Sequence, residues 1–289
     1  LYGGSATLAL SSFAAALSSH DAMAIAGIVL VILAFFLKAA IVPFHAWAPD
    51  AYEGASLPVT AYMATIIKAG VLLAALRLFG TAPMSGPMIG LIAFLPLVSI
   101  VWGNLTAMRQ TSFRRMIAYS SIAHAGYLFY AFLGAGPGRY EAVVFYLLAY
   151  GLLNVLAFAS IPPNDDDATR DRLDTLRGLF HRDPYAAVMI GIAMLSLAGI
   201  PPFPGFVAKF LIFKNVIAAG YTMYAVLGLV GSYLGIYFYL RVIQMMFMSP
   251  EADTGTRVAH GRAALAASVL CLVPTIAIAV FPGWVFGRF

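Results

Sequence analysis

Long apolar segments with few charges constrain this chain more than any other feature of its sequence. They cover residues 1–17, a shorter stretch, and then 22–43, 57–79, 87–108, 115–135, 140–161, 185–215, 221–247 and 262–285. A helix of about 20 apolar residues crosses a hydrocarbon core of about 30 Å, and only helices and closed barrels satisfy their backbone groups in lipid. Because the alternation typical of barrel strands is absent, the sequence predicts an all-α polytopic transmembrane bundle. We expect about nine spans, the first incomplete, in a single domain over residues 1–289.

The composition excludes a water-soluble fold and several kinds of site. Charged residues make up 10% of the chain and hydrophobic residues 62%, whereas a soluble domain carries about 25% charged residues. The single cysteine, Cys271, excludes a disulfide framework and a cysteine-ligated metal or iron–sulfur site. No nucleotide-binding motif or flavin site is present either. We therefore expect no cofactor and no metal in this chain.

The basic residues follow membrane topology, so the net charge of +5 does not indicate nucleic-acid binding. Cytoplasmic loops of membrane proteins carry an excess of Arg and Lys. Four basic residues lie on one side of the predicted spans, namely Arg77, Arg139, Lys214 and Arg288. Ten lie on the other side, namely Arg109, Arg114, Arg115, Arg170, Arg172, Arg177, Arg182, Arg241, Arg257 and Arg262. The ten-residue side is predicted to be cytoplasmic.

Three lysines, Lys38, Lys68 and Lys209, lie inside predicted spans. A lysine near the centre of a span costs about 2.5–3.5 kcal/mol on insertion scales, and such residues usually mark ion or proton pathways. The alternative is that the side chain extends to the interface. This alternative fits Lys68 and Lys209 poorly because long apolar runs flank them, whereas Lys38 is intermediate. Lysine suits proton exchange because burial can lower the pKa of an ammonium group toward neutrality, whereas arginine stays protonated.

Two apolar segments are interrupted by proline beside a lysine. Pro43 follows Lys38, and "GIPPFPGFVAK", residues 199–209, leads to Lys209. Proline removes a backbone donor, and non-helical backbone at membrane depth is tolerated where protein or a water-filled cavity covers it. The two interrupted segments are five spans apart, so they cross the membrane in opposite directions. This inverted arrangement of discontinuous helices is typical of secondary transporters.

Two histidines are further candidates. His124 lies in the apolar segment "MIAYSSIAHAGYLFYAF". It either relays protons, because histidine titrates near neutrality, or hydrogen-bonds a neighbouring helix. His45, next to Pro43, is either a pathway residue or a loop anchor. Asn104 and Asn154 are predicted to form hydrogen bonds between helices.

Three blocks of sequence resemble a known family. "KAAIVPFHAWAPDAYEGASLPVTAYMATIIKAG", "GNLTAMRQTSFRRMIAYSSIAHAGYL" and "GIPPFPGFVAKF" are similar to subunit N of the proton-pumping NADH–quinone oxidoreductases, respiratory complex I. Related antiporter-like subunits and Mrp-type antiporters typically read "PDAH" where this chain has "PDAYEG", and carry a further histidine where it has "AYMATIIK". The resemblance therefore favours subunit N over its paralogues, and the chain matches the C-terminal two-thirds of that family's length.

The resemblance implies a function for the intramembrane residues. Lys38, Lys68 and Lys209 match the family's proton-channel lysines, and a glutamate that pairs with the first of them is expected in N-terminal spans that this chain lacks. The implied protein is a proton-translocating subunit of the bacterial inner membrane with other complex I membrane subunits as partners. NADH, FMN, iron–sulfur clusters and quinone would then bind to those partners. A stand-alone Mrp-type cation/proton antiporter subunit and a structural membrane subunit without transport stay open as alternatives.

The charge bias generates a topology prediction. Single cysteines placed beside Arg114 and Arg177, in a chain whose Cys271 is replaced by serine, should resist a membrane-impermeant maleimide added to intact cells. They should react once the membrane is opened. Labelling from the outer face would contradict the prediction.

Overall fold

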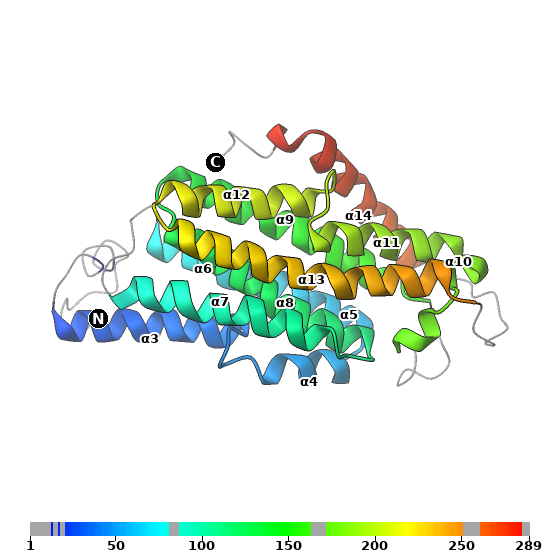
Figure 1. The fold of residues 1–289 in the computed structure, drawn as a ribbon, viewed down its shortest axis with the longest axis horizontal. Coiled ribbons are helices and arrows are strands. Elements are labelled where there is room, and N and C mark those ends of the chain that lie inside the picture. Colours follow the sequence, from blue (N-terminus) through cyan, green and yellow to red (C-terminus); the bar gives the residue numbers. More distant parts are fainter. Residues whose placement is uncertain are drawn as a thin grey trace.

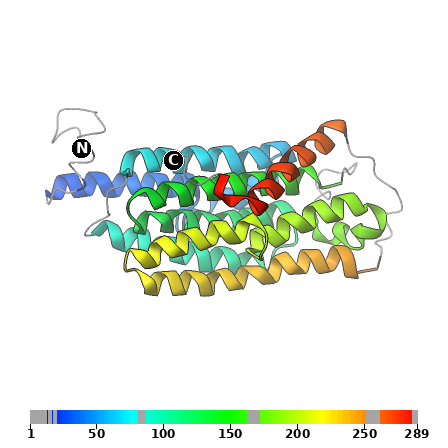
Figure 2. The same ribbon diagram turned by 90° about the horizontal axis from the view of Figure 1, so that it is seen from above.

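The computed structural model describes Phe13, Leu17 and residues 21–80, 87–162, 172–250 and 261–284. Within these residues the fold consists of helices and contains no β-sheet (Figures 1 and 2). The predicted span at 1–17 lies outside the described residues apart from Phe13 and Leu17. The predicted all-α bundle is confirmed.

Seven helical spans in the described part are long and apolar enough to cross a membrane. Five of them are single α-helices: Ala22–Ala39 (α3), Pro87–Ala107 (α7), Pro137–Ala159 (α9), Thr222–Met248 (α13) and Arg262–Val280 (α14). The Leu57–Phe79 span consists of α5 (Leu57–Tyr62), the π-helical turn η1 (Met63–Ile67) and α6 (Lys68–Phe79). The Phe113–Leu133 span consists of α8 (Phe113–Tyr130) and η2 (Ala131–Leu133). Shorter elements are Trp47–Gly54 (α4), Leu173–Leu176 (η3), Leu179–Arg182 (α10), Pro184–Ala198 (α11), Pro204–Ala218 (α12) and Pro282–Trp284 (η4). The long helices lie side by side in one bundle (Figures 1 and 2).

The outer surface of the bundle is apolar, whereas α8 forms its centre. Leu30, Val230 and Leu270, on three different helices, are each more than half exposed. Of the most apolar 18 residues in the span that contains α8, 94% are buried, whereas the corresponding share is 22% in α3 and in α14. An apolar outer face around a buried central helix fits a bundle surrounded by lipid. Polar groups on α8 are therefore shielded from the hydrocarbon.

Both predicted discontinuous helices are present and run in opposite directions: α3 to α4 and α11 to α12 (Figure 1). The first halves end with the same pair of backbone hydrogen bonds. Ala40 and Ile41 donate to Leu37 and Phe36, and Gly199 and Ile200 donate to Ser196 and Leu195. This is the Schellman pattern, in which the capping residue adopts a left-handed conformation. Each break also contains a cis proline bond, Val42–Pro43 in the first and Pro201–Pro202 in the second.

The first break differs in position from its prediction. The helix ends at Ala39, before Pro43, and resumes as α4 up to Gly54. The first discontinuous segment is therefore longer than the predicted 22–43. Ala40 ends the helix with φ 62°, a conformation that costs a non-glycine residue about 1–3 kcal/mol and persists where surrounding structure enforces it.

Close approach at the second break depends on a glycine. A Cβ atom on Gly205, at the start of α12, would lie 1.8 Å from the carbonyl oxygen of Ser196 on α11. The backbone amide of Gly205 also donates a 3.1 Å hydrogen bond to Ser196 Oγ. Because any side chain would collide with backbone, residue 205 must be glycine for α11 and α12 to meet in this way.

Arg139, one of the four basic residues on the less basic side of the predicted spans, is buried. It lies in the first turn of α9 with 0% exposure. Its guanidinium donates to the carbonyl oxygens of Gly134, Phe132 and Gly80. Arg139 thus joins three chain segments at this end of the bundle, because its planar fork of donors can satisfy several carbonyls at once.

Gly205→Ala should separate the two halves of the second discontinuous helix. Overpacking usually costs about 1–3 kcal/mol, and here the obstacle is backbone that cannot rotate away. We expect a lower thermal midpoint and less protein in the membrane. The matched control is Gly151→Ala on α9, where a Cβ meets nothing within 4 Å. Equal midpoints for both variants would contradict this account of the break.

Candidate functional site

Lys68 lies in the middle of the Leu57–Phe79 span, directly after the π-helical turn η1. Its exposed fraction is 4%, and Nζ donates hydrogen bonds to the carbonyl and hydroxyl oxygens of Ser121 on α8. The ring centroid of Tyr150 on α9 lies 5.4 Å from Nζ, within cation–π range. These partners offset part of a desolvation penalty that amounts to several kcal/mol for a buried ion. π-helical turns inside helices are frequent at functional sites.

His124 lies one turn beyond Ser121 on α8 and is 4% exposed. Its Nδ1 is 2.7 Å from the hydroxyl of Tyr146 on α9, and its Nε2 is 3.0 Å from the hydroxyl of Tyr239 on α13. A neutral imidazole donates from one nitrogen and accepts at the other, so the two hydroxyls take complementary roles. The Tyr150 ring lies 4.8 Å from the imidazole, centroid to centroid. His124 is therefore hydrogen-bonded to two helices at once.

Lys209 lies on α12, five residues after the second break. It is 8% exposed, and Nζ donates to the carbonyl of Ala198 at 2.9 Å and to Ser232 Oγ on α13 at 3.0 Å. Ala198 is the last residue of α11, where helix carbonyls lack intrahelical partners and carry partial negative charge. The break thus supplies an acceptor that a continuous helix would not offer. The Tyr127 ring centroid lies 5.1 Å from Nζ.

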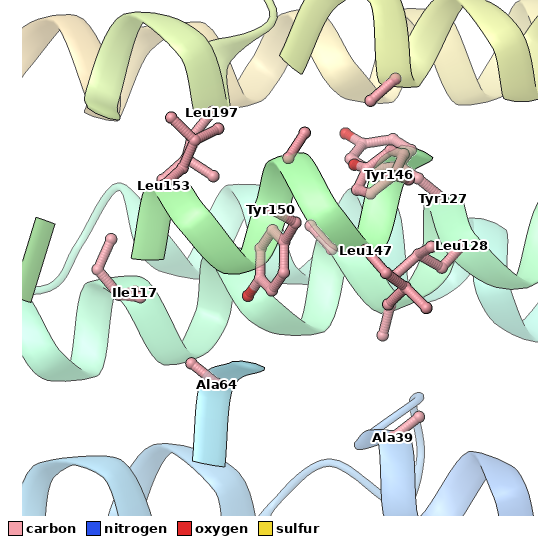
Figure 3. Packing of buried hydrophobic residues seen from close by; sticks show 14 of the residues in the cluster. Ala39, Ala64, Ile117, Tyr127, Leu128, Tyr146, Leu147, Tyr150, Leu153 and Leu197 are labelled. Atoms are coloured by element: carbon pink, nitrogen blue, oxygen red, sulfur yellow. The ribbon is translucent and has the colours of Figure 1, made fainter. Parts of the chain in front are cut away.

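These groups lie one after another between the two buried lysines, and the Tyr150 ring contacts both Lys68 and His124. Ser121, His124 and Tyr127 are spaced three residues apart on α8, which places them along one face of the helix. Ser121 contacts Lys68, Tyr127 contacts Lys209, and the His124 and Tyr127 rings lie 5.6 Å apart. Figure 3 shows Tyr150 of α9 with its hydroxyl toward the helix that carries Ala64, and Tyr146 and Tyr127 on the other side. We call Lys68, Ser121, His124, Tyr127 and Lys209 the polar line.

The polar line contains groups that can both give and take a proton. A lysine accepts a proton in its amine form and donates one in its ammonium form, and imidazole and hydroxyl groups can do both. Among the described residues, no Asp or Glu forms an ion pair with Lys68 or Lys209. The same residues contain no group of three His, Cys, Asp or Glu side chains that could hold a metal ion. The arrangement suits proton exchange.

Two hollows adjoin the polar line. A cavity of about 10 Å³ beside His124 is lined by Tyr146, Tyr150, Gly205 and neighbouring apolar residues; about 10–15 Å³ is the lower limit for one water molecule. A groove of about 650 Å³ between α12 and α13 is lined by Lys209, Ser232 and mostly apolar side chains. Lys209 therefore borders a groove, whereas Lys68 is enclosed against α8 and α9.

Lys38 and His45 lie outside the polar line. Lys38 is in the last turn of α3, exposed, and forms no hydrogen bond or ion pair with the described residues. His45 lies in the first break and is partly buried, and its Nε2 accepts a 3.1 Å hydrogen bond from Trp102 Nε1 on α7. This contact fits the loop-anchor alternative for His45. Lys38 and His45 are thus the predicted site residues that the structure does not bring together with the others.

Sequence reasoning missed several members of the site. Tyr146, Tyr150, Tyr239 and Ser232 are buried beside the polar line although no motif marked them. One signal was available: Tyr146 and Tyr150 are four residues apart in a span, far from the interfaces where tyrosine is usually enriched. Asn104 bonds α8 and α13 through Tyr127 and Gly231, whereas the Nδ2 of Asn154 bonds Tyr150 O of its own helix. The prediction of an interhelical bond is confirmed for Asn104 alone of the two.

The fold and the buried polar line define a multi-pass membrane protein with two inverted discontinuous helices. A family described as "NADH:quinone oxidoreductase/Mrp antiporter, TM" matches residues 1–235. The chain belongs to this family.

Individual relatives are consistent with this membership. The NADH-quinone oxidoreductase subunit N of Pelobacter propionicus is 43% identical over 97% of this chain and 60% of that protein. A chain of respiratory complex I from Thermus thermophilus is 36% identical with TM-score 0.79, over 95% of this chain and 64% of that one. A chain of the Mrp complex from a Dietzia species shares the fold, with TM-score 0.82 and 24% identity over 98% of this chain and 61% of that one.

The predicted resemblance to subunit N is confirmed by these relatives. The chain spans about 60% of the length of the Pelobacter relative. Family membership, apolar spans and bacterial relatives together place the protein in the bacterial inner membrane as a multi-pass protein.

Replacing Lys68 by methionine tests whether the buried ammonium supports the fold. An unbranched apolar side chain of similar length removes a desolvation cost of several kcal/mol, so stability should be unchanged or higher. The measurement is the thermal midpoint of the purified protein, with exposed Lys214→Met as the control. A fall of several degrees specific to Lys68→Met would mean that the lysine is structural.

Proposed function

We propose that the chain is a proton-translocating membrane subunit of an NADH–quinone oxidoreductase. The observation that carries the proposal is the polar line, in which Ser121, His124 and Tyr127 lie between two buried lysines. Intramembrane lysines oppose insertion, so a pair kept at membrane depth needs a function that offsets the cost. Proton exchange is the function that these groups share.

The polar line would carry protons in steps between neighbouring groups. An amine at Lys68 takes up a proton, and an ammonium at Lys209 releases one. His124, bonded to hydroxyls from its two ring nitrogens, can gain a proton on one nitrogen and lose one from the other. The cavity beside it leaves room for about one water molecule.

Electron transfer would occur in partner subunits. NADH, FMN, iron–sulfur clusters and quinone bind there under this proposal, and their chemistry reaches this chain as a shift in the protonation of the lysines. A conformational or charge change at a partner contact would bias the two protonation states, which is how local electrostatic switches produce a distant effect. The other complex I membrane subunits are the proposed partners.

The second candidate is an Mrp-type cation/proton antiporter subunit. Its support is the shared fold of the Dietzia Mrp chain, at 24% identity. The oxidoreductase relatives are more similar, at 43% and 36% identity, so we favour complex I. A complex I subunit should co-purify with several other membrane subunits, whereas an antiporter should restore salt tolerance to a sensitive host.

Lys38 stays a predicted member of the route. Its exposure in the described structure means that a function in transport requires a covering partner. Lys38→Ala and Lys38→Arg distinguish a requirement for proton exchange at residue 38 from a requirement for positive charge. Arginine keeps the positive charge but does not release its proton, so loss of transport in both variants would indicate that proton exchange is required. Full activity in both would remove Lys38 from the route.

The test of the proposal is NADH-driven proton uptake by membrane vesicles at equal complex content. Lys68→Ala and Lys209→Ala should each lose most of the uptake, and His124→Ala should lower it while assembly stays intact; loss of one acid–base group typically costs about 10²–10⁴-fold in rate. Arg77→Ala, at an exposed position of α6 away from the polar line, is the control. Wild-type uptake by both lysine variants would refute the proposal and leave a structural subunit as the better reading.

A further inference from the structure

The second half of the first discontinuous helix, α4, contacts the polar line through a tyrosine. Tyr52 is 3% exposed, and its hydroxyl lies 3.3 Å from Ser121 Oγ. Ser121 Oγ is also the acceptor for Lys68. Three polar groups are therefore in contact one after another in space: the Tyr52 hydroxyl on α4, the Ser121 hydroxyl on α8 and the Lys68 amine on α6.

Charged groups hold α4 in this position at the end of the bundle where the sequence places ten basic residues, which we call the arginine-rich end. Arg115, in the first turn of α8, forms ion pairs with Asp50 at 2.7 Å and Glu53 at 2.8 Å, both on α4. Arg114 donates a 2.6 Å hydrogen bond to the carbonyl of Ala55, which follows α4. Asp50 and Glu53 flank Tyr52 in sequence, and their side chains are 74% and 42% exposed. Because residues one or two positions apart on a helix do not face each other, the carboxylates mark the solvated face of α4, and Tyr52 lies on its buried face against α8.

We propose that Tyr52 is the access residue through which Lys68 exchanges protons with the arginine-rich, predicted cytoplasmic side. This inference rests on the proposed function and names its entry point. A proton that enters from the α4 side arrives at the Tyr52 oxygen as the hydroxyl proton of Tyr52 passes to Ser121 Oγ. The proton of Ser121 then passes to the Lys68 amine. Both hydroxyls are regenerated, and Lys68 has gained one proton.

The geometry favours this direction of access to Lys68. Its hydrogen bonds go to Ser121, and the described polar neighbour of Ser121 toward the arginine-rich end is Tyr52. Lys209, by contrast, borders the groove between α12 and α13. The two lysines would then exchange protons with different surroundings, one through α4 and the other beyond α12. A line with separate access at its two ends transports protons in a net direction when access alternates.

The first discontinuous helix acquires a function in this scheme. Because the chain breaks at residues 40–46, α4 can take an orientation independent of α3 and press Tyr52 against α8. The Tyr52 carbonyl also accepts a 2.9 Å hydrogen bond from Thr60 Oγ1 on α5, which fixes the backbone at the same residue. The ion pairs of Arg115 and this bond together set the distance between the Tyr52 and Ser121 hydroxyls.

Tyr52→Phe in the assembled complex is the direct test, because it removes the hydroxyl and keeps the ring. NADH-driven proton uptake should fall at least about tenfold at unchanged complex content, in line with loss of a proton-transfer group. Tyr62→Phe, on exposed Tyr62 of α5, should match wild type. Tyr52→His should recover part of the uptake, because imidazole can carry a proton where a phenyl ring cannot.

The outcomes separate this inference from the proposed function. Wild-type uptake in Tyr52→Phe together with loss of uptake in Lys68→Ala would overturn the access function of Tyr52 and leave the polar line intact. Wild-type uptake in Tyr52→Phe, in Lys68→Ala and in Lys209→Ala would overturn both the inference and the proposed function. Reduced complex content in Tyr52→Phe, with no recovery in Tyr52→His, would show that the hydroxyl bond to Ser121 only packs α4 and would also overturn the inference.

Discussion

Two ammonium groups buried in an apolar bundle are the constraint on which the rest of the structure depends. Each would cost several kcal/mol if left unsolvated and unpaired, and the described residues offer neither lysine a carboxylate. The chain instead surrounds Lys68 and Lys209 with hydroxyls, carbonyls and tyrosine rings. These neutral partners stabilise the ammonium form but do not prevent loss of its proton. After that loss the neutral amine can accept a hydrogen bond from the same hydroxyl group to which the ammonium donated. A carboxylate would hold the proton more firmly.

The broken helices follow from the same constraint. At the second break, the carbonyl of Ala198 is free of its helix and bonds Lys209. Gly205 allows α12 to start directly against α11, which keeps Lys209 within reach of that carbonyl. At the first break, α4 separates from α3 and brings Tyr52 to Ser121. The second break therefore supplies a hydrogen-bond acceptor for Lys209. The first break allows α4 to lie beside Ser121, which is the hydrogen-bond partner of Lys68.

The sequence predicts the architecture well because hydropathy alone specifies a membrane span. The helices match the predicted segments to within a few residues, except at the first break. There the cause is Ala40, whose left-handed conformation depends on tertiary context, whereas Pro43 is visible in the sequence. The burial of Arg139 was not predictable, because the order of residues in the chain does not show that three carbonyl oxygens converge on this side chain in space.

The site was predictable in part for a similar reason. An isolated charge in an apolar run is conspicuous, so Lys68, Lys209 and His124 could be found, but their neighbours Tyr52, Tyr146 and Tyr239 look like ordinary membrane tyrosines. Which lysines face the interior also depends on packing. Lys38 also lies beside a helix break, yet it is exposed in the described structure.

The central claim is that Lys68 and Lys209 belong to a single route. The most direct measurement compares proton uptake per NADH oxidised in Lys68→Ala, in Lys209→Ala and in the double variant, at equal complex content. Groups that act in series are strongly non-additive, so the double variant should retain the same residual uptake as the lower single variant. If each single variant lost part of the uptake and the double variant lost the sum, the lysines would serve separate routes, and the account of one polar line would be contradicted.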